Sequence, residues 1–286
     1  MTIEAERLTS TEELGACVEL QRTILGDRAR SVWSVPALTG VCQSGGLVLG
    51  ARDTEDGAAG LCGALIDLVA DVGGYPAYHT VFRGVRPPSR NRGAGYTLRT
   101  DERAICQREG VDLVFWSLDP LRSDEAHMAF NKLGAIATGY RRNLYGEVHD
   151  NANTGLATDR LRVEWWIDSP RVTSILDRGN AAPHYRLGIH EMNVLTDTRL
   201  RRDGVRMLSG RASPPNGEHV LAEIPVDLDG IRVHDPAAAR EWRLLSRSVF
   251  ELLLESGYVG VGFVHEGGRS FHLFRKTDRR TALRDN

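Results

Sequence analysis

The residues best suited to chemistry lie in one short stretch, between Val85 and Gly95. An Arg-x-x-Gly-x-Gly pattern, Arg90 to Gly95, follows two prolines there and precedes a segment with helical spacing. Glycines at a helix start leave the first backbone N–H groups uncovered, and the positive end of the helix dipole lies at the same place. Arg90 and Arg92 add charged donors. The pattern predicts a pyrophosphate site, with a plain glycine-rich turn as the alternative.

A regular succession of elements surrounds this loop and must position it. Residues 78–85 form a predicted strand that ends at the prolines, and residues 94–109 form a predicted helix with Gly110 as its stop. The continuous apolar stretch 111–118 predicts a buried strand, and a second helix is expected over 123–133. This order of strand, loop, helix, strand and helix favours an α/β layer over an all-β sandwich.

Helices and strands are also predicted over the rest of the chain. Two more helices are predicted, residues 11–25 after a capping box at Ser10 and residues 236–255 after an Asp-Pro start. Seven further strands are predicted, over residues 47–49, 61–69, 140–148, 161–167, 219–226, 259–264 and 270–274.

Over residues 78–135 this arrangement resembles the GNAT superfamily of acyl-CoA N-acyltransferases. The residues that carry the likeness are Val85-Arg86-Pro87, the loop from Arg90 to Gly95, the apolar strand and Leu133-Gly134-Ala135. Other stretches resemble a bacterial branch of predicted GNAT acetyltransferases: Asp119-Pro120-Leu121, Asn143-Leu144-Tyr145-Gly146, Thr158-Asp159-Arg160-Leu161, Val163-Glu164-Trp165, Trp242-Arg243 and Gly257-Tyr258. The resemblance implies an α/β (α+β) fold with a mixed, mostly antiparallel central sheet, two splayed strands, flanking helices and a C-terminal α/β extension.

The resemblance also implies a cofactor, acetyl-CoA or another acyl-CoA. The pantetheine arm would lie between the splayed strands 78–85 and 111–118, where Val85 would supply backbone hydrogen bonds. The pyrophosphate would bind the N–H groups of Arg90, Asn91, Arg92, Gly93, Ala94 and Gly95. The amine of a small-molecule acceptor would then attack the thioester directly in a ternary complex.

Candidate acid and base residues follow from the same resemblance. Phe130 stands where many family members have a tyrosine that protonates the leaving thiolate, and phenylalanine cannot donate a proton. Tyr145, Tyr140 or water is therefore expected to replace it, with Tyr145 as our candidate. His79, at the start of the central strand, is the candidate base because imidazole takes up a proton near neutral pH. A histidine that is simply satisfied within the strand is the alternative.

We expect structural roles for four other charged residues. We expect Asp119 to cap the helix that follows it. Asp159, Arg160 and Glu164 flank a predicted strand and predict either a buried ion network or a substrate clamp, with the network favoured.

Two other functions remain open. Phe130 favours a non-catalytic acyl-CoA-binding module. The same scaffold also supports another reaction of the thioester, such as hydrolysis or decarboxylation of an acyl-CoA.

We expect two domains, residues 1–168 as the acyl-CoA-binding domain and residues 169–286 as a C-terminal α/β domain. The second resembles a degenerate half of the first, and it lacks the Arg-x-x-Gly-x-Gly pattern. It is expected to form a wall on the acceptor side of the cleft or a homodimer interface.

Composition limits the partners. The 36 Lys and Arg residues against 38 Asp and Glu residues give a net charge of -2, which excludes a strongly basic nucleic-acid binder. No apolar run approaches the roughly 20 residues that cross a bilayer, and no signal-peptide pattern is visible. The four cysteines include no C-x-x-C pair, so a cytoplasmic protein with reduced thiols is expected. His184, His190 and Glu191 lack the spacing of a zinc-protease helix, and no metal site is predicted.

Overall fold

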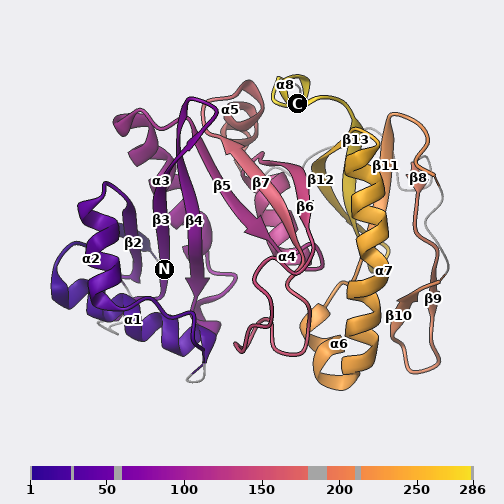
Figure 1. Cartoon of the computed structure of the whole chain (residues 1–286), viewed down its shortest axis with the longest axis horizontal. Helices are drawn as coiled ribbons and strands as arrows, with labels where there is room; N and C mark the ends of the chain where they lie inside the picture. The colour runs from indigo at the N-terminus through magenta and orange to yellow at the C-terminus, as the bar shows by residue number, and fades with distance from the viewer. Residues whose placement is uncertain (1, 27–28, 55–59, 180–191, 210–213, 285–286) are drawn as a thin grey trace. The chain divides into compact units, whose positions relative to one another are not determined.

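The structure is a computed structural model that describes residues 2–26, 29–54, 60–179, 192–209 and 214–284 (Figure 1). Contacts within the chain define two compact units. The first comprises Met1–Trp116 with Val148–Thr154, and the second comprises Ser117–Glu147 with Gly155–Asn286. The expected division into domains at residue 168 stays a prediction, since the compactness of a part does not establish that it folds alone.

The first unit is built on five strands in their order along the chain. Each neighbouring pair is antiparallel except the last, which is parallel. The strands are β1 (Ile3–Arg7), β2 (Leu47–Asp53), β3 (Gly63–Val72), β4 (Tyr75–Val85) and β5 (Leu113–Leu118). The helices are α1 (Thr11–Leu25), α2 (Val35–Gln43) and α3 (Ala94–Glu109), with a single 3₁₀ turn at Pro87–Ser89.

The two faces of this sheet carry different helices. Leu14 of α1 and Leu38 of α2 belong to one buried cluster with Ile66 of β3, so α1 and α2 cover that face. Successive side chains of a strand point to opposite faces, and a Cβ at Gly63 would lie 3.2 Å from Leu98 of α3. The helix α3 therefore packs on the other face of the sheet.

Local sequence signals account for the helix ends. The Ser10 hydroxyl accepts from the backbone of Glu13, and the Glu13 carboxylate accepts from the backbone of Ser10, so the predicted capping box is present. Gly110 ends α3 in the left-handed region, with φ 72°. The predicted helices 11–25, 94–109 and 236–255 are confirmed with the same bounds.

The second unit contains a six-stranded, mostly antiparallel sheet in the order β7-β6-β12-β13-β11-β8. Its strands are β6 (Ile136–Arg141), β7 (Arg160–Trp166), β8 (Asn193–Val194), β11 (His219–Ile224), β12 (Tyr258–Glu266) and β13 (Arg269–Lys276), and a separate hairpin joins β9 (Thr198–Leu200) to β10 (Arg206–Leu208). Its helices are α4 (Ser123–Ala126), which continues as a π-helix over His127–Lys132, then α5 (Pro170–Asp177), α6 (Leu228–His234), α7 (Pro236–Glu255) and α8 (Arg279–Ala282).

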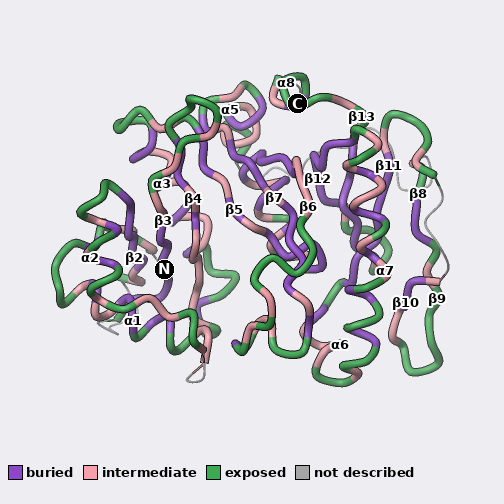
Figure 2. The backbone as a smooth tube through the Cα atoms, viewed as in Figure 1, coloured by how far each residue is buried: buried purple, intermediate pink, exposed green. Residues whose placement is uncertain are grey.

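The core of the second unit is built around α7 and the strands. Trp242, Phe250 and Leu253 are among the buried residues of α7. Figure 2 shows buried residues along the strands of both units, with exposed residues at the turns. The predicted fold class is confirmed: a mixed α/β protein with mostly antiparallel strands, parallel pairing of β4 with β5 and of β8 with β11, and a C-terminal α/β region.

One predicted strand is wrong. Residues 140–148 were expected to be extended, but β6 ends at Arg141 and the chain then turns through Asn143 (φ 43°) and Gly146 (φ 67°). The backbone N–H groups of Asn143 and Tyr145 donate to the side chains of Asp159 and Thr158, 3.0 Å away in each case. These side chains replace the strand partners that the segment would otherwise need.

None of the helices in the described ranges is long and apolar enough to cross a membrane. The four cysteines are reduced thiols, and Cys17, Cys62 and Cys106 are buried.

Candidate functional site

The start of α3 is an open backbone donor site. Gly93 is its N-cap, in the left-handed region with φ 94°, and no side chain caps the first turn. Asn91 is also left-handed, with φ 58°. A Cβ built at Gly93 would meet no atom within 4 Å, and the first turn carries no acidic residue. The loop therefore leaves space for an anion at the positive end of the helix dipole.

The strand that leads into this loop separates from its neighbour. The strands β4 and β5 pair from Ala77 with Leu113 to Thr80 with Trp116. Beyond Thr80, β4 continues for five residues to Val85 and remains paired with β3 as far as Gly63. A β-bulge at Val81, where the register with β3 shifts, bends β4 at this point. The splayed strands expected from the sequence are thus present.

The predicted cofactor residues surround the end of the splayed half. Val85 is half-buried, while Arg90, Asn91, Arg92 and Gly93 are exposed. The Arg90 Nε donates to the Val85 carbonyl oxygen at 3.4 Å, so this guanidinium already lies over the strand end. The first unit therefore brings together the residues expected to bind pantetheine and pyrophosphate, including Ala94 and Gly95 in the first turn of α3. Their role in binding stays a prediction.

His79 lies on β4, one residue before the strands separate. Its ring stacks on Phe115 of β5 with centroids 4.5 Å apart and an interplanar angle of 7°. Its partner across β3 is Leu68, which packs against the cluster under α1 and α2. His79 thus shares the α1 and α2 face of the sheet, whereas Thr80 points to the α3 face. The half-buried imidazole is placed for proton transfer on that face, and its catalytic role stays a prediction.

Tyr145 belongs to the second unit, in the turn after β6. It is 52% exposed, and the Arg160 guanidinium carbon lies 5.5 Å from its ring centroid. Its backbone N–H donates to the Thr158 hydroxyl. Its role as the acid stays a prediction.

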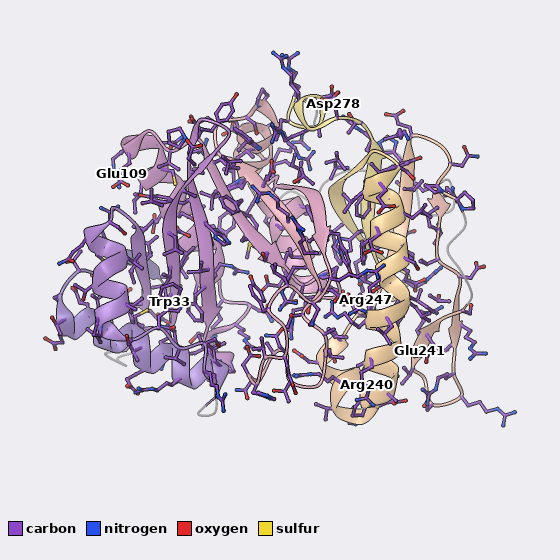
Figure 3. The ribbon with its side chains drawn as sticks, viewed as in Figure 1. Trp33, Glu109, Arg240, Glu241, Arg247 and Asp278 are labelled. Atoms are coloured by element: carbon purple, nitrogen blue, oxygen red, sulfur yellow. The ribbon has the colours of Figure 1, made fainter. Side chains whose placement is uncertain are left out.

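Tyr140 is the less suitable acid. Its phenol donates to Asp159 Oδ2 at 2.7 Å, and its ring stacks on Phe250. Burial, together with the Asp159 charge, raises the pKa of Tyr140 above its usual value. Asp159 is itself held by Arg247 of α7, labelled in Figure 3, at 2.6 and 2.9 Å. The Tyr140 proton is therefore committed to this network.

Phe130 occupies a closed position in the second unit. It lies on the π-helix with 1% of its surface exposed, and its ring meets His272 edge-on at 5.6 Å. The imidazole of His272 contacts the Pro120 carbonyl oxygen at 2.7 Å, and burial lowers the pKa of His272 to about 4. Phe130 is therefore part of an aromatic core.

We expected Asp119 to cap the helix after it, but it does not. The N-cap of α4 is Arg122, which makes no side-chain cap bond, and Asp119 instead accepts from the backbone of Leu121 at 3.0 Å. Both Asp119 oxygens accept from Arg243 Nη2, at 2.8 and 2.6 Å, and Arg160 lies 3.6 Å away. Burial alone would raise the pKa of Asp119, but the two guanidinium groups lower it to about 2.

The other charged residues around β7 form ion pairs and hydrogen bonds within the second unit. Asp159 pairs with Arg247, whereas Glu164 accepts from Thr138 and Trp166 and pairs with Arg162. This is the ion network that the sequence favoured over a substrate clamp.

Sequence reasoning missed a buried cluster on the α3 face of the first unit. Arg99 and Glu102 of α3 form an ion pair at 2.7 Å that is almost fully buried. Arg99 also donates to Thr80 at 2.9 Å, and its guanidinium carbon lies 4.1 Å from the Trp116 ring centroid. The buried Asp67 of β3 is opposite Thr80 in the sheet. The available signal was an acid within an apolar strand and an Arg-x-x-Glu spacing on a helix.

Within the described ranges, no three or more His, Cys, Asp and Glu side chains gather in a way that could hold a metal ion. His184, His190 and Glu191 lie outside the described residues.

No protein-family model and no curated protein matches the chain. Several solved structures resemble it. The ribosomal-protein-S18-alanine N-acetyltransferase from Escherichia coli is 16% identical, with a TM-score of 0.43 over 58% of this chain and 94% of that one. The NatC complex bound to Gag peptide and CoA is 15% identical, with a TM-score of 0.47 over 57% and 98%.

An acetyltransferase of the GNAT family from Streptococcus pneumoniae is 11% identical, with a TM-score of 0.45 over 57% of this chain and 98% of that one. Each of these three matches covers a little more than half of this chain. At these identities and TM-scores the likeness is a distant one of fold, so we argue function from this chain's own residues. The splayed parallel pair and the glycine-rich helix start are both present in this chain.

Proposed function

We propose that this protein is an acyl-CoA-dependent N-acyltransferase, which transfers an acetyl group from acetyl-CoA, or the acyl group of another acyl-CoA, to the amine of a small molecule. The observation that carries the proposal is the junction of the splayed half of β4 with the uncapped start of α3. An extended arm that ends in a diphosphate fits such a junction, because the half of β4 beyond its last pair with β5 leads to the uncapped first turn of α3.

Each part of the junction has a separate role. The backbone of Arg90 to Gly95 and the guanidinium groups of Arg90 and Arg92 hold the diphosphate. Val85 and the preceding residues of β4 pair with the pantetheine arm in the manner of an added strand. The bound thioester supplies the acyl group. With both ends of the arm fixed, the remaining work is to position an amine, and positioning accounts for a large share of the rate in such transfers.

The proton steps are assigned to two side chains. His79 accepts the proton that the amine loses on attack, through an imidazole on the α1 and α2 face of the sheet. Tyr145 stays our candidate for the acid that protonates the leaving thiolate, since this residue is exposed whereas the phenol of Tyr140 is bound to Asp159.

Activity is tested with acetyl-CoA and a panel of small amines, by following thiol release and the mass of the products. We expect an acylated amine together with free coenzyme A. Thiol release without an acylated amine would identify hydrolysis or decarboxylation instead.

The cofactor loop is tested by calorimetry on Gly93→Val. A Cβ at φ 94° is strained, and the branched side chain covers the N–H donors, so we expect the affinity for coenzyme A to fall by about a hundredfold. Gly73→Val is the matched control. It has the same left-handed strain (φ 64°) and the same open space, but it lies in the turn between β3 and β4. Equal affinities of Gly93→Val and Gly73→Val would contradict the assignment.

The buried Phe130 favours a second candidate, a non-catalytic acyl-CoA-binding module. That function predicts coenzyme A binding with no acylated product from any amine, and no change in binding for His79→Ala. The C-terminal region is still predicted to form either a wall on the acceptor side or a homodimer interface. Light scattering tests the homodimer by measuring the mass of the protein in solution.

A further inference from the structure

Arg99 joins three elements at the last rung between β4 and β5. Its Nη1 donates to Thr80 Oγ1 at 2.9 Å, and its guanidinium lies over Trp116 at 4.1 Å. Thr80 and Trp116 are partners in the last pair of the parallel register. Arg99 itself belongs to α3, the helix whose N-terminus forms the diphosphate site. One buried side chain thus touches both strands at the point where they separate.

The charges around Arg99 balance without a further anion. Glu102 accepts from Arg99 with both oxygens, at 2.9 and 2.7 Å. Burial, followed by the charge of Glu102, raises the pKa of Asp67 well above its usual value, which opposes a second negative charge in this cluster. The charges of Arg99 and Glu102 pair with each other, which is the arrangement that a buried ion pair requires. The ion pair is therefore complete within the first unit, where Arg99 also contacts both strands.

We propose that Arg99 is a positioning residue of the acyl-CoA site: it fixes the last paired rung of β4 and β5, so that β4 stays open from Val81 to Val85 and aligned with the start of α3. This inference rests on the proposed function. It concerns a residue that touches neither the cofactor nor the acceptor.

The geometry explains how such a residue acts at a distance. From Thr80 to Val85 the open strand edge is about 16 Å long, at the usual rise per strand residue. From Gly93 to Arg99 the helix rises by about 9 Å. A ligand that occupies both the strand edge and the helix start requires the two to stay in register, whereas a ligand at the helix start alone does not. Loss of Arg99 should therefore weaken the first kind of ligand selectively.

The test compares two ligands by calorimetry: coenzyme A, and adenosine 3′-phosphate 5′-diphosphate, which keeps the diphosphate but lacks the pantetheine arm. Arg99→Lys keeps the charge opposite Glu102 but cannot both bond Thr80 and cover Trp116. We expect its dissociation constant for coenzyme A to rise about tenfold, with a change of less than about twofold for the nucleotide without the arm.

Thr80→Val is the second variant, and it carries the test if Arg99→Lys does not fold. It removes only the hydroxyl that Arg99 binds, so we expect the same selectivity with a loss of about threefold for coenzyme A. Arg108→Met is the control, because Arg108 is an exposed residue near the end of the same helix. Neither affinity should change in it.

Three results would overturn the inference. Equal weakening of both ligands would show that the helix start itself is disturbed, and unchanged affinities in both variants would show that the rung is irrelevant. Failure of the unaltered protein to bind coenzyme A would remove the proposed function, and the inference with it. Selective loss in the variants, with coenzyme A bound by the unaltered protein, supports both.

Discussion

Two aspartates, one in each compact unit, are buried beside arginine, but their pKa values are shifted in opposite directions. Asp67 lies under α3 with Arg99 and a second carboxyl, Glu102, and neither of its oxygens has a hydrogen-bond partner among the described residues. Its pKa is raised by burial and by the charge of Glu102. Asp119 accepts from Arg243 with both oxygens and lies near Arg160, so its pKa falls to about 2 despite its burial.

The difference follows from the number of charges in each cluster. In the first unit two carboxyls share one guanidinium, and the pKa of Asp67 is raised. In the second unit two guanidinium groups share one carboxylate, and the pKa of Asp119 is lowered. Burial acts in the same direction on both, and the ratio of neighbouring charges decides the outcome. The following variants test this comparison, from the largest expected effect to the smallest.

Asp119→Asn should destabilise the protein most, by about 3–5 kcal/mol, because it leaves Arg243 and Arg160 buried without a counter-charge. The free energy of unfolding from denaturant titration measures the loss. Asp229→Asn is the control: Asp229 also pairs with an arginine, Arg122, but is 44% exposed, and we expect a loss below about 1 kcal/mol. Similar losses for the two variants would refute the role of burial.

His272 should make stability depend on pH in the acid range. Burial lowers the pKa of His272 from 6.5 to about 4, so the unfolded chain binds the proton more readily between these values. Stability is then complete above pH 6.5 and falls by about 3 kcal/mol as the pH drops to 4. His272→Gln should lack this loss in the same titration. Asp119 adds a further loss in the same direction, between pH 3.8 and 2.

Glu102→Gln should cost less than Asp119→Asn, about 1–2 kcal/mol. The reason is that Asp67 is a second carboxyl in the same cluster, and it can ionise to replace Glu102 beside Arg99. Carboxyl resonances in NMR should show the pKa of Asp67 falling in this variant. A pKa that stays raised would mean that burial alone keeps Asp67 neutral.

Asp67→Asn is expected to have the smallest effect at pH 4, and the effect is in the opposite direction. Because the pKa of native Asp67 is raised, the aspartate costs stability as the pH rises above 3.8. The asparagine variant should therefore gain stability relative to the native protein as the pH rises from 4. A gain that is independent of pH would contradict the raised pKa of Asp67.

The sequence was most informative where structure is local. The helices 11–25, 94–109 and 236–255 have the expected bounds because caps and glycine stops act within a few residues. The glycine loop at α3 was visible for the same reason. The predicted strand over residues 140–148 is wrong because the chain turns there. The side chains of Thr158 and Asp159, more than ten residues away, accept the backbone hydrogen bonds of the turn.

The candidate site shows the same division. The residues from Val85 to Gly95 could be predicted because they are contiguous, whereas Arg99, Thr80 and Trp116 come from three elements and no spacing connects them. The sequence by itself determined the helices that have local caps and glycine stops, and it predicted a diphosphate site, since capping, periodicity and glycine freedom depend on neighbours along the chain. Tertiary structure decided which charges are buried together, and with them the raised pKa of Asp67, the low pKa of Asp119 and the rung at which β4 and β5 separate. Desolvation and charge pairing depend on distances in space, which the order of residues does not specify.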